Sequence, residues 1–186
     1  MKDTVPRLAR SSEEAHAYMR MRPCEQCGAS GFDPDCVMLD SEYGLLSRYE
    51  GVCSGCGVER EFAFRLAEQD AFPDDEEPEF GDDRPSELLD PGEWLWLADM
   101  IARYSPADPD GLDARARRRA RIDLRTAAAA VDEVLKFIAP GAEEVPTGAF
   151  WSDTGVAVHR HEPGRFRRGR LAVVRATYRE IAERFA

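Results

Sequence analysis

Residues 24–28 read Cys-Glu-Gln-Cys-Gly, and residues 53–57 repeat the pattern as Cys-Ser-Gly-Cys-Gly. Each turn presents two thiolates to one ion, so the two turns together offer four sulfur ligands. Zn²⁺ binds four thiolates in a tetrahedron at about 2.3 Å and has no geometric demand of its own. The glycine after each second cysteine lets the backbone curl so that amides face the sulfurs. The sequence therefore predicts a structural Zn²⁺ site formed by Cys24, Cys27, Cys53 and Cys56.

Other uses of paired cysteines fit the sequence less well. The chain has five cysteines, an odd number, and residues 1–7 contain no apolar run for export. We therefore expect a reducing cytoplasm rather than a disulfide framework. Two matching turns without a βαβ pattern disfavour a thioredoxin-type redox pair. Iron in place of zinc stays open, because rubredoxin-type sites use similar turns.

The residues between and after the two turns have the pattern of β-strands. Strands are predicted at 36–40 and 45–49, joined by a turn near 42–44, and at 58–66, where Phe62, Phe64 and Leu66 alternate with polar or small residues. Cys36 opens the first of these strands. A core thiol is favoured for it over a fifth metal ligand.

Over residues 22–66 this arrangement resembles the four-cysteine zinc ribbon, a family with two knuckles at one end of a small antiparallel sheet. The resemblance implies that sheet and a structural zinc ion. Ribbons bind DNA, RNA or proteins, or only brace a fold, so the resemblance implies no activity. The whole chain is also similar to bacterial proteins in which a ribbon precedes a helical region, a likeness that again implies no activity.

Helix signals flank the predicted ribbon. Ser11 and Glu14 have the spacing of a capping box for a helix that ends near residue 22. Residues 90–93 (Asp-Pro-Gly-Glu) predict the start of a helix over 93–104 that is apolar nearly all round, so we expect neighbours on every side. Its polar stripe is Asp99 and Arg103, at the spacing that allows them to pair.

A long helix is predicted over residues 111–138, a short one from residue 152 and a last one near 171–185. The predicted fold class is α+β, with a small antiparallel zinc-ribbon sheet followed by about four helices. The predicted division is residues 1–67 as the N-terminal helix plus ribbon, 68–84 as an acidic linker or loop, and 85–186 as the helical region.

The charge of the chain is unevenly distributed. The formal net charge is −11. Residues 68–90 contain eleven acids and one base, Arg84, so almost the whole excess lies there. An acid excess weakens the case for general nucleic-acid binding, which depends on neutralising phosphates, and suits a basic partner. No apolar stretch approaches the ~20 residues of a membrane span, so no membrane association is expected.

The most basic stretch is residues 163–170, in which four arginines surround Phe166. Guanidinium groups bind phosphates and carboxylates through paired hydrogen bonds. The candidate anion or nucleic-acid site therefore consists of Arg165, Arg167, Arg168 and Arg170. The competing interpretation is that these arginines bind the chain's own acids or lie in solvent.

These features favour a non-enzymatic cytoplasmic adaptor or regulatory protein that binds another protein, because a Cys₄ zinc site leaves no open position for catalysis. The alternative is a nucleic-acid-binding zinc ribbon that uses residues 165–170. An enzyme is disfavoured, since the sequence offers no nucleophile–base pair at readable spacing, no phosphate-binding glycine loop and no second metal cluster. The oligomeric state is left open.

Overall fold

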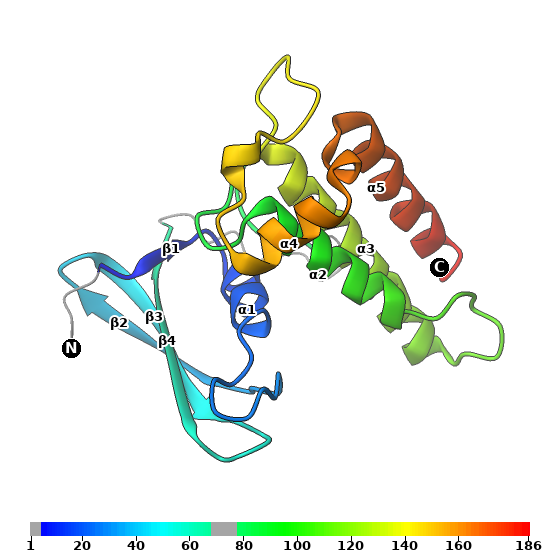
Figure 1. Ribbon diagram of the computed structural model, residues 1–186. Coiled ribbons are helices and arrows are strands. Elements are labelled where there is room, and N and C mark those ends of the chain that lie inside the picture. Colours follow the sequence, from blue (N-terminus) through cyan, green and yellow to red (C-terminus); the bar gives the residue numbers. More distant parts are fainter. Residues whose placement is uncertain (1–4, 68–77) are drawn as a thin grey trace. The chain divides into compact units, whose positions relative to one another are not determined.

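The computed structural model describes residues 5–67 and 78–186 and has an α+β fold (Figure 1). The chain divides into two compact units, Met1–Ala71 and Phe72–Ala186. The first unit carries a sheet and one α-helix, and the second carries four further α-helices.

The first unit is built on a mixed sheet of four strands. The strands are β1 (Arg7–Ala9), β2 (Asp35–Ser41), β3 (Gly44–Val52) and β4 (Glu59–Leu66). Their order is β1-β4-β3-β2, with β2–β3 and β3–β4 antiparallel. The prediction of a purely antiparallel sheet is wrong, because β1 pairs with β4 in parallel. A three-residue strand is too short to show alternation, so the sequence pattern did not indicate it.

The predicted hairpin is confirmed, with Glu42 and Tyr43 between β2 and β3. The Ser41 hydroxyl accepts a hydrogen bond from the Tyr43 amide at 3.1 Å and donates to the Gly44 carbonyl at 2.8 Å. Gly44 has a φ of 94°, a conformation that glycine adopts without strain. These contacts fix where β2 ends and therefore its register on β3.

Helix α1 (Ser12–Arg20) packs on the sheet through aromatic rings. Tyr18 meets Phe62 and Phe64 edge to face, with centroids 6.3 and 5.5 Å away, and His16 meets Tyr49 at 5.2 Å. These partners lie on β3 and β4, so the core of the first unit forms beneath α1 at these two strands. Phe64 and Tyr49 are buried, as core residues of this kind should be.

The N-terminus of α1 is held by side chains. Ser11 is its N-cap, as predicted, and its hydroxyl accepts from the Glu14 amide at 3.0 Å. The Glu14 carboxylate accepts from the Arg10 amide at 2.7 Å and binds the Arg10 guanidinium at 2.6 Å. Glu14 is fully buried, and the pairing with Arg10 compensates its charge.

The expectation of a core thiol at Cys36 is wrong, because this side chain is exposed. Cys36 lies on β2, at the end of the sheet and opposite Tyr49. Most of β2 is exposed, since the ring contacts of α1 reach β3 and β4 only.

The second unit consists of α2 (Pro91–Tyr104), α3 (Ala114–Lys136), α4 (Asp153–His161) and α5 (Arg168–Glu183). Two 3₁₀ turns, Thr147–Ala149 and Pro163–Phe166, lie between the last three helices. With α1, the described residues form five α-helices rather than about four. Helix α3 packs against both α2 and α5 (Figure 1). Small residues on α3 allow this close approach, and Ala120 packs with Leu124, Ala182 and Phe185 in a buried cluster.

Helix α2 is less enclosed than its sequence predicts. Trp94, Leu95 and Leu97 are buried, whereas Trp96 is 41 % and Tyr104 81 % exposed. The expected pairing of Asp99 with Arg103 is replaced by a stronger contact, because both Asp99 oxygens accept hydrogen bonds from Arg165, at 2.6 and 2.7 Å.

The acidic segment 68–84 is only partly described, and residues 68–77 lie outside the described residues. Its last part belongs to the second unit. Phe80 is buried against Trp94, with ring centroids 4.7 Å apart. The Lys136 amine donates to the carbonyls of Gly81 and Asp82, at 3.2 and 2.7 Å. Residues 80–82 are therefore part of the helical packing.

Asp90 joins the starts of two helices. It is fully buried and is the N-cap of α2, so the predicted helix start is confirmed, and it forms a capping box with Glu93. One carboxylate oxygen accepts from the amides of Gly92 and Glu93, both at 2.9 Å. The other accepts from the Trp151 amide and from both the amide and the hydroxyl of Ser152, the N-cap of α4. Five donors thus compensate one buried charge.

Replacing Asp90 by Asn should lower the free energy of unfolding of the second unit by about 2–4 kcal/mol. The substitution removes one acceptor oxygen and points an amide N–H₂ at groups that are already donors. Chemical denaturation followed by tryptophan fluorescence measures the loss. Asp113→Asn is the matched control, because Asp113 caps α3 from an exposed position and Asn caps a helix equally well. Equal effects of the two substitutions would contradict this account of Asp90.

Candidate metal centre

The structure brings four of the five cysteine sulfurs together. The ligand atoms of Cys24, Cys27, Cys53 and Cys56 all lie within 4.8 Å of one another. The Sγ atoms of Cys24 and Cys56 are 3.7 Å apart, and those of Cys27 and Cys53 are 3.6 Å apart. Tetrahedral bonds of about 2.3 Å place neighbouring sulfurs about 3.8 Å apart, so these spacings suit one Zn²⁺ ion. They exceed the S–S bond of about 2.05 Å, so the cysteines are four free thiols.

The two cysteine turns have the same backbone geometry. The Gly28 amide donates to the Cys24 carbonyl at 2.7 Å, and the Gly57 amide donates to the Cys53 carbonyl at 2.8 Å. Both glycines have a left-handed φ, 74° and 72°. A left-handed residue at this point turns the chain back around the sulfurs, as the sequence predicts from the two Cys-x-x-Cys-Gly patterns.

Gly55, inside the second turn, is a site residue that the sequence reasoning missed. A Cβ atom at Gly55 would lie 2.8 Å from the Ala29 Cβ and 3.1 Å from the Cys27 Sγ. The glycine therefore allows the second turn to approach the first. Its amide also points at a ligand, with the nitrogen 3.4 Å from the Cys53 sulfur. The sequence feature that could have identified Gly55 is a glycine between the two cysteines of a Cys-x-x-Cys turn.

Contacts outside the cysteines also join the two turns. Phe32 forms an isolated antiparallel β-bridge with Cys53, and the amide of Ser54 donates to the Gly31 carbonyl at 3.2 Å. The Arg60 guanidinium lies 4.6 Å from the centroid of the Phe32 ring, a cation–π contact. Gly31 and Phe32 follow the first turn. Their partners either lie in the second turn, as Cys53 and Ser54 do, or follow it, as Arg60 does, so these contacts join the same two segments as the sulfurs.

The pKa values of Cys53 and Cys56 are shifted in opposite directions. Hydrogen bonds from the backbone amides of Gly55 and Cys56 lower the pKa of Cys53 to about 6. The pKa of Cys56 is raised to about 12: the Val58 amide acts to lower it, but burial and the sulfurs of the other three cysteines outweigh that effect. One thiolate thus opposes the formation of a second beside it. A divalent cation among the sulfurs removes this repulsion, which is why clustered thiols bind metal with loss of protons.

The expected coordination is closed. Four thiolates complete the tetrahedral sphere of Zn²⁺, and no position remains for water or a substrate. Cys36 does not belong to the cluster. The arrangement of the sulfurs accommodates a structural ion.

The predicted arginine patch is divided among different partners. Arg165 binds Asp99, and this contact raises the pKa of Arg165. The Arg168 guanidinium donates to the backbone carbonyls of Ala142, Ile138 and Ala139 after α3. Arg167 and Arg170 are exposed, and the Arg167 side chain lies 3.9 Å from Glu144. Two of the four guanidinium groups are therefore engaged within the chain, and the role of the patch in anion binding stays a prediction.

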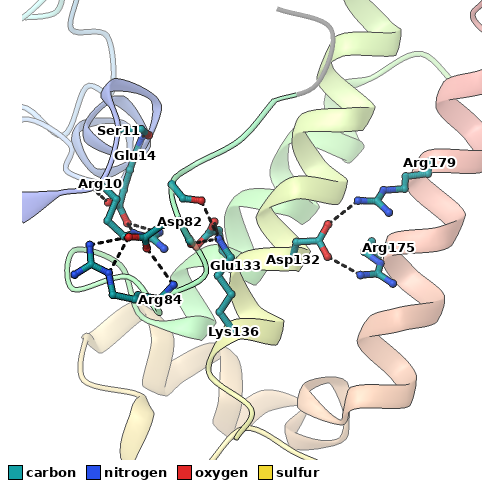
Figure 2. A network of polar contacts seen from close by, with 11 residues as sticks. Arg10, Ser11, Glu14, Asp82, Arg84, Asp132, Glu133, Lys136, Arg175 and Arg179 are labelled. Atoms are coloured by element: carbon teal, nitrogen blue, oxygen red, sulfur yellow. Dashed lines mark hydrogen bonds and ion pairs between the residues drawn. The ribbon is translucent and has the colours of Figure 1, made fainter. Parts of the chain in front are cut away.

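A cavity of about 750 Å³ in the second unit is lined by charged side chains from α3 and α5. Figure 2 shows Asp132 of α3 reaching Arg175 and Arg179 of α5, at 2.6 and 2.8 Å. Arg125 pairs with Glu183 at 2.9 Å across the same helices. These ion pairs connect α5 to α3.

No family model matches the chain, and no curated protein or solved structure was found to be similar to it. The likeness to zinc ribbons therefore depends on the cysteine spacing and geometry alone. None of the helices in the described part of the chain has both the length and the apolar character needed to cross a membrane.

The purified chain should contain one Zn²⁺ ion, and its removal by a chelator should unfold the first unit. Structural zinc contributes about 10–16 kcal/mol in zinc-finger peptides, which is comparable with the whole stability of a domain. Elemental analysis and thermal unfolding measure both effects, and elemental analysis also distinguishes zinc from iron. Cys53→Ala should abolish metal binding, whereas Cys36→Ala should retain it. A melting temperature that metal removal leaves unchanged would contradict the structural role.

Replacing Gly57 by Ala should destabilise the metal-loaded first unit by about 1–2 kcal/mol, the cost of a left-handed backbone for a residue with a Cβ. No atom lies within 4 Å of the added Cβ, so a clash does not contribute. Denaturant titration measures the change. Gly57→Asn should cost less, because Asn tolerates this conformation, and Gly164→Ala should have little effect. Equal losses of stability for Gly57→Ala and Gly164→Ala would contradict the role assigned to the left-handed φ of Gly57.

Proposed function

We propose that this chain is a zinc-stabilised, non-enzymatic adaptor or regulatory protein that binds another protein. The observation that carries the proposal is the closed cluster of four sulfurs, all within 4.8 Å of one another. A metal enclosed by four thiolates braces the fold and leaves catalysis without a coordination position. The first unit then acts through the surface that it presents to a partner protein.

The charge of the chain supports a protein partner with a basic surface. The formal net charge is −11, and a Zn²⁺ ion with four thiolates adds −2 to it. Such a charge repels the phosphates of nucleic acids and attracts lysine and arginine side chains. The second unit also supports the proposal. Charged groups at its cavity form ion pairs across α3 and α5, so these side chains have a structural role between the two helices.

Affinity capture from the native cell, with and without nuclease, tests the proposal. The zinc-loaded chain is expected to retain protein partners from nuclease-treated lysate. A variant with Cys53→Ala is the control, because it lacks a complete cluster and should lose the partners that depend on the ribbon.

The alternative of nucleic-acid binding through residues 165–170 makes the opposite prediction. Capture would then depend on nucleic acid and fall steeply with salt. Arg167→Ala with Arg170→Ala removes the two exposed guanidinium groups of the patch while leaving the contacts of Arg165 and Arg168 intact. Two results together would make the protein-adaptor proposal fail in favour of this alternative. Nuclease would remove every captured protein, and the unaltered chain would bind RNA or DNA at low salt whereas the double variant would not.

A further inference from the structure

Strand β2 ends the sheet of the first unit and pairs on one side only among the described residues. The strand order is β1-β4-β3-β2, and β2 is antiparallel to β3 over all of its seven residues. In an antiparallel pair, alternate residues direct their amide and carbonyl groups toward the partner strand, and the intervening residues direct theirs away. The outer side of β2 therefore presents backbone hydrogen-bonding groups to a further strand.

Strand β2 carries apolar side chains on both faces of the sheet. Val37 and Met38 lie on opposite faces by the pleat of the strand, and they are 41 % and 48 % exposed. Leu45, across from Asp40 on β3, is 41 % exposed. An added strand would bring side chains beside Val37 and Met38 on each face and remove this apolar surface from water.

The charges on β2 and in its flanking residues have one sign, and Arg48, opposite Val37 on β3, is paired with Glu50 at 3.0 Å. Residues 23–47 contain five acids and no lysine or arginine. Four of these acids flank β2 or lie within it and are exposed, namely Asp33, Asp35, Asp40 and Glu42. The apolar centre of β2 is thus bounded by carboxylates at both ends.

This charge pattern selects against a second copy of the chain. Antiparallel self-pairing about Met38, the middle of β2, would place Asp35 of each copy opposite Ser41 of the other and would bring Asp33 and Asp35 of one copy beside the end of the other copy that carries Asp40 and Glu42. Like charges gathered in this way at both ends of the strand pair oppose association. The same carboxylates would attract lysine or arginine at the ends of a different strand.

We propose that β2 is the docking site of the partner, and that it takes an extended segment with basic residues at its ends and β-branched residues between them. The segment adds to the sheet as a fifth strand, and its main chain supplies affinity while its charges set direction and register. This inference rests on the proposed protein-binding function and names the partner's chemistry.

The probe is a capped seven-residue peptide, Lys-Val-Thr-Ile-Thr-Val-Lys, with a counterpart in which both lysines are glutamates. The zinc-loaded full chain, labelled with ¹⁵N, is titrated with each peptide at low salt. The basic peptide should bind more tightly, and the amide resonances that move should be those of β2 and its flanks. No binding of the basic peptide, or shifts confined to other strands, would overturn the inference.

A charge-swap variant, Asp35→Lys with Asp40→Lys, tests the specificity. It should weaken the basic peptide about tenfold and make the acidic peptide the preferred ligand. Glu59→Lys with Glu61→Lys is the matched control, since it makes the same change at exposed positions of β4 and should keep the original preference. If both variants behave alike, net charge and not the β2 edge governs binding.

Backbone methylation separates strand addition from simple attraction of charge. One basic peptide is N-methylated at its residues 2, 4 and 6, and another at residues 3 and 5. An added strand donates only alternate amides, so one peptide should lose binding and the other should keep it. Equal affinities of the two peptides would exclude a fifth strand.

The charge-swap variant also separates this inference from the function beneath it. If the variant captures the same proteins from nuclease-treated lysate as the unaltered chain, the β2 inference fails and the adaptor function stands. If the unaltered chain captures no protein, the adaptor function itself fails.

Discussion

The first unit depends on bringing four sulfurs together from turns that begin at Cys24 and Cys53. The hairpin of β2 and β3 lies between those turns, so closure of the cluster restrains both ends of this hairpin. Its core is small, because the ring contacts of α1 reach β3 and β4 while β2 remains mostly exposed. A core of this size gives limited hydrophobic stabilisation, and an ion bound by the four sulfurs would add to it.

The second unit manages a buried charge by a different device. The Asp90 carboxylate is surrounded by five donors from the starts of α2 and α4, and glycine makes the approach possible. A Cβ at Gly155 would lie less than 2.5 Å from the Asp90 carboxylate. In the first unit, a cation held by the four sulfurs would compensate the thiolates; in the second unit, amides and a hydroxyl compensate a carboxylate. The two units therefore have separate sources of stability, which agrees with their division in the structure.

Local signals predicted much of this structure. The cysteine spacing indicated which sulfurs gather, and the Asp-Pro-Gly-Glu sequence indicated where α2 begins, because ligand turns and helix caps depend on residues a few positions apart. The predictions that were wrong concern partners distant in sequence. Asp99 is four residues from Arg103 but binds Arg165, whose guanidinium fork meets both of its oxygens. Cys36 has the pattern of a core strand, yet its exposure is decided by the position of β2 in the strand order.

The ion and the edge strand are connected physically. One cysteine turn precedes β2 and the other follows β3, so closing the cluster restrains both ends of this hairpin. The full register of β2 on β3 carries that restraint to the outer edge of the sheet. An edge that is already ordered loses little conformational entropy when another strand pairs with it, so more of the interaction energy appears as affinity. A metal ion held by the four sulfurs would thus favour strand addition without taking part in a reaction, by keeping a short strand with exposed Val37 and Met38 extended and ready to pair.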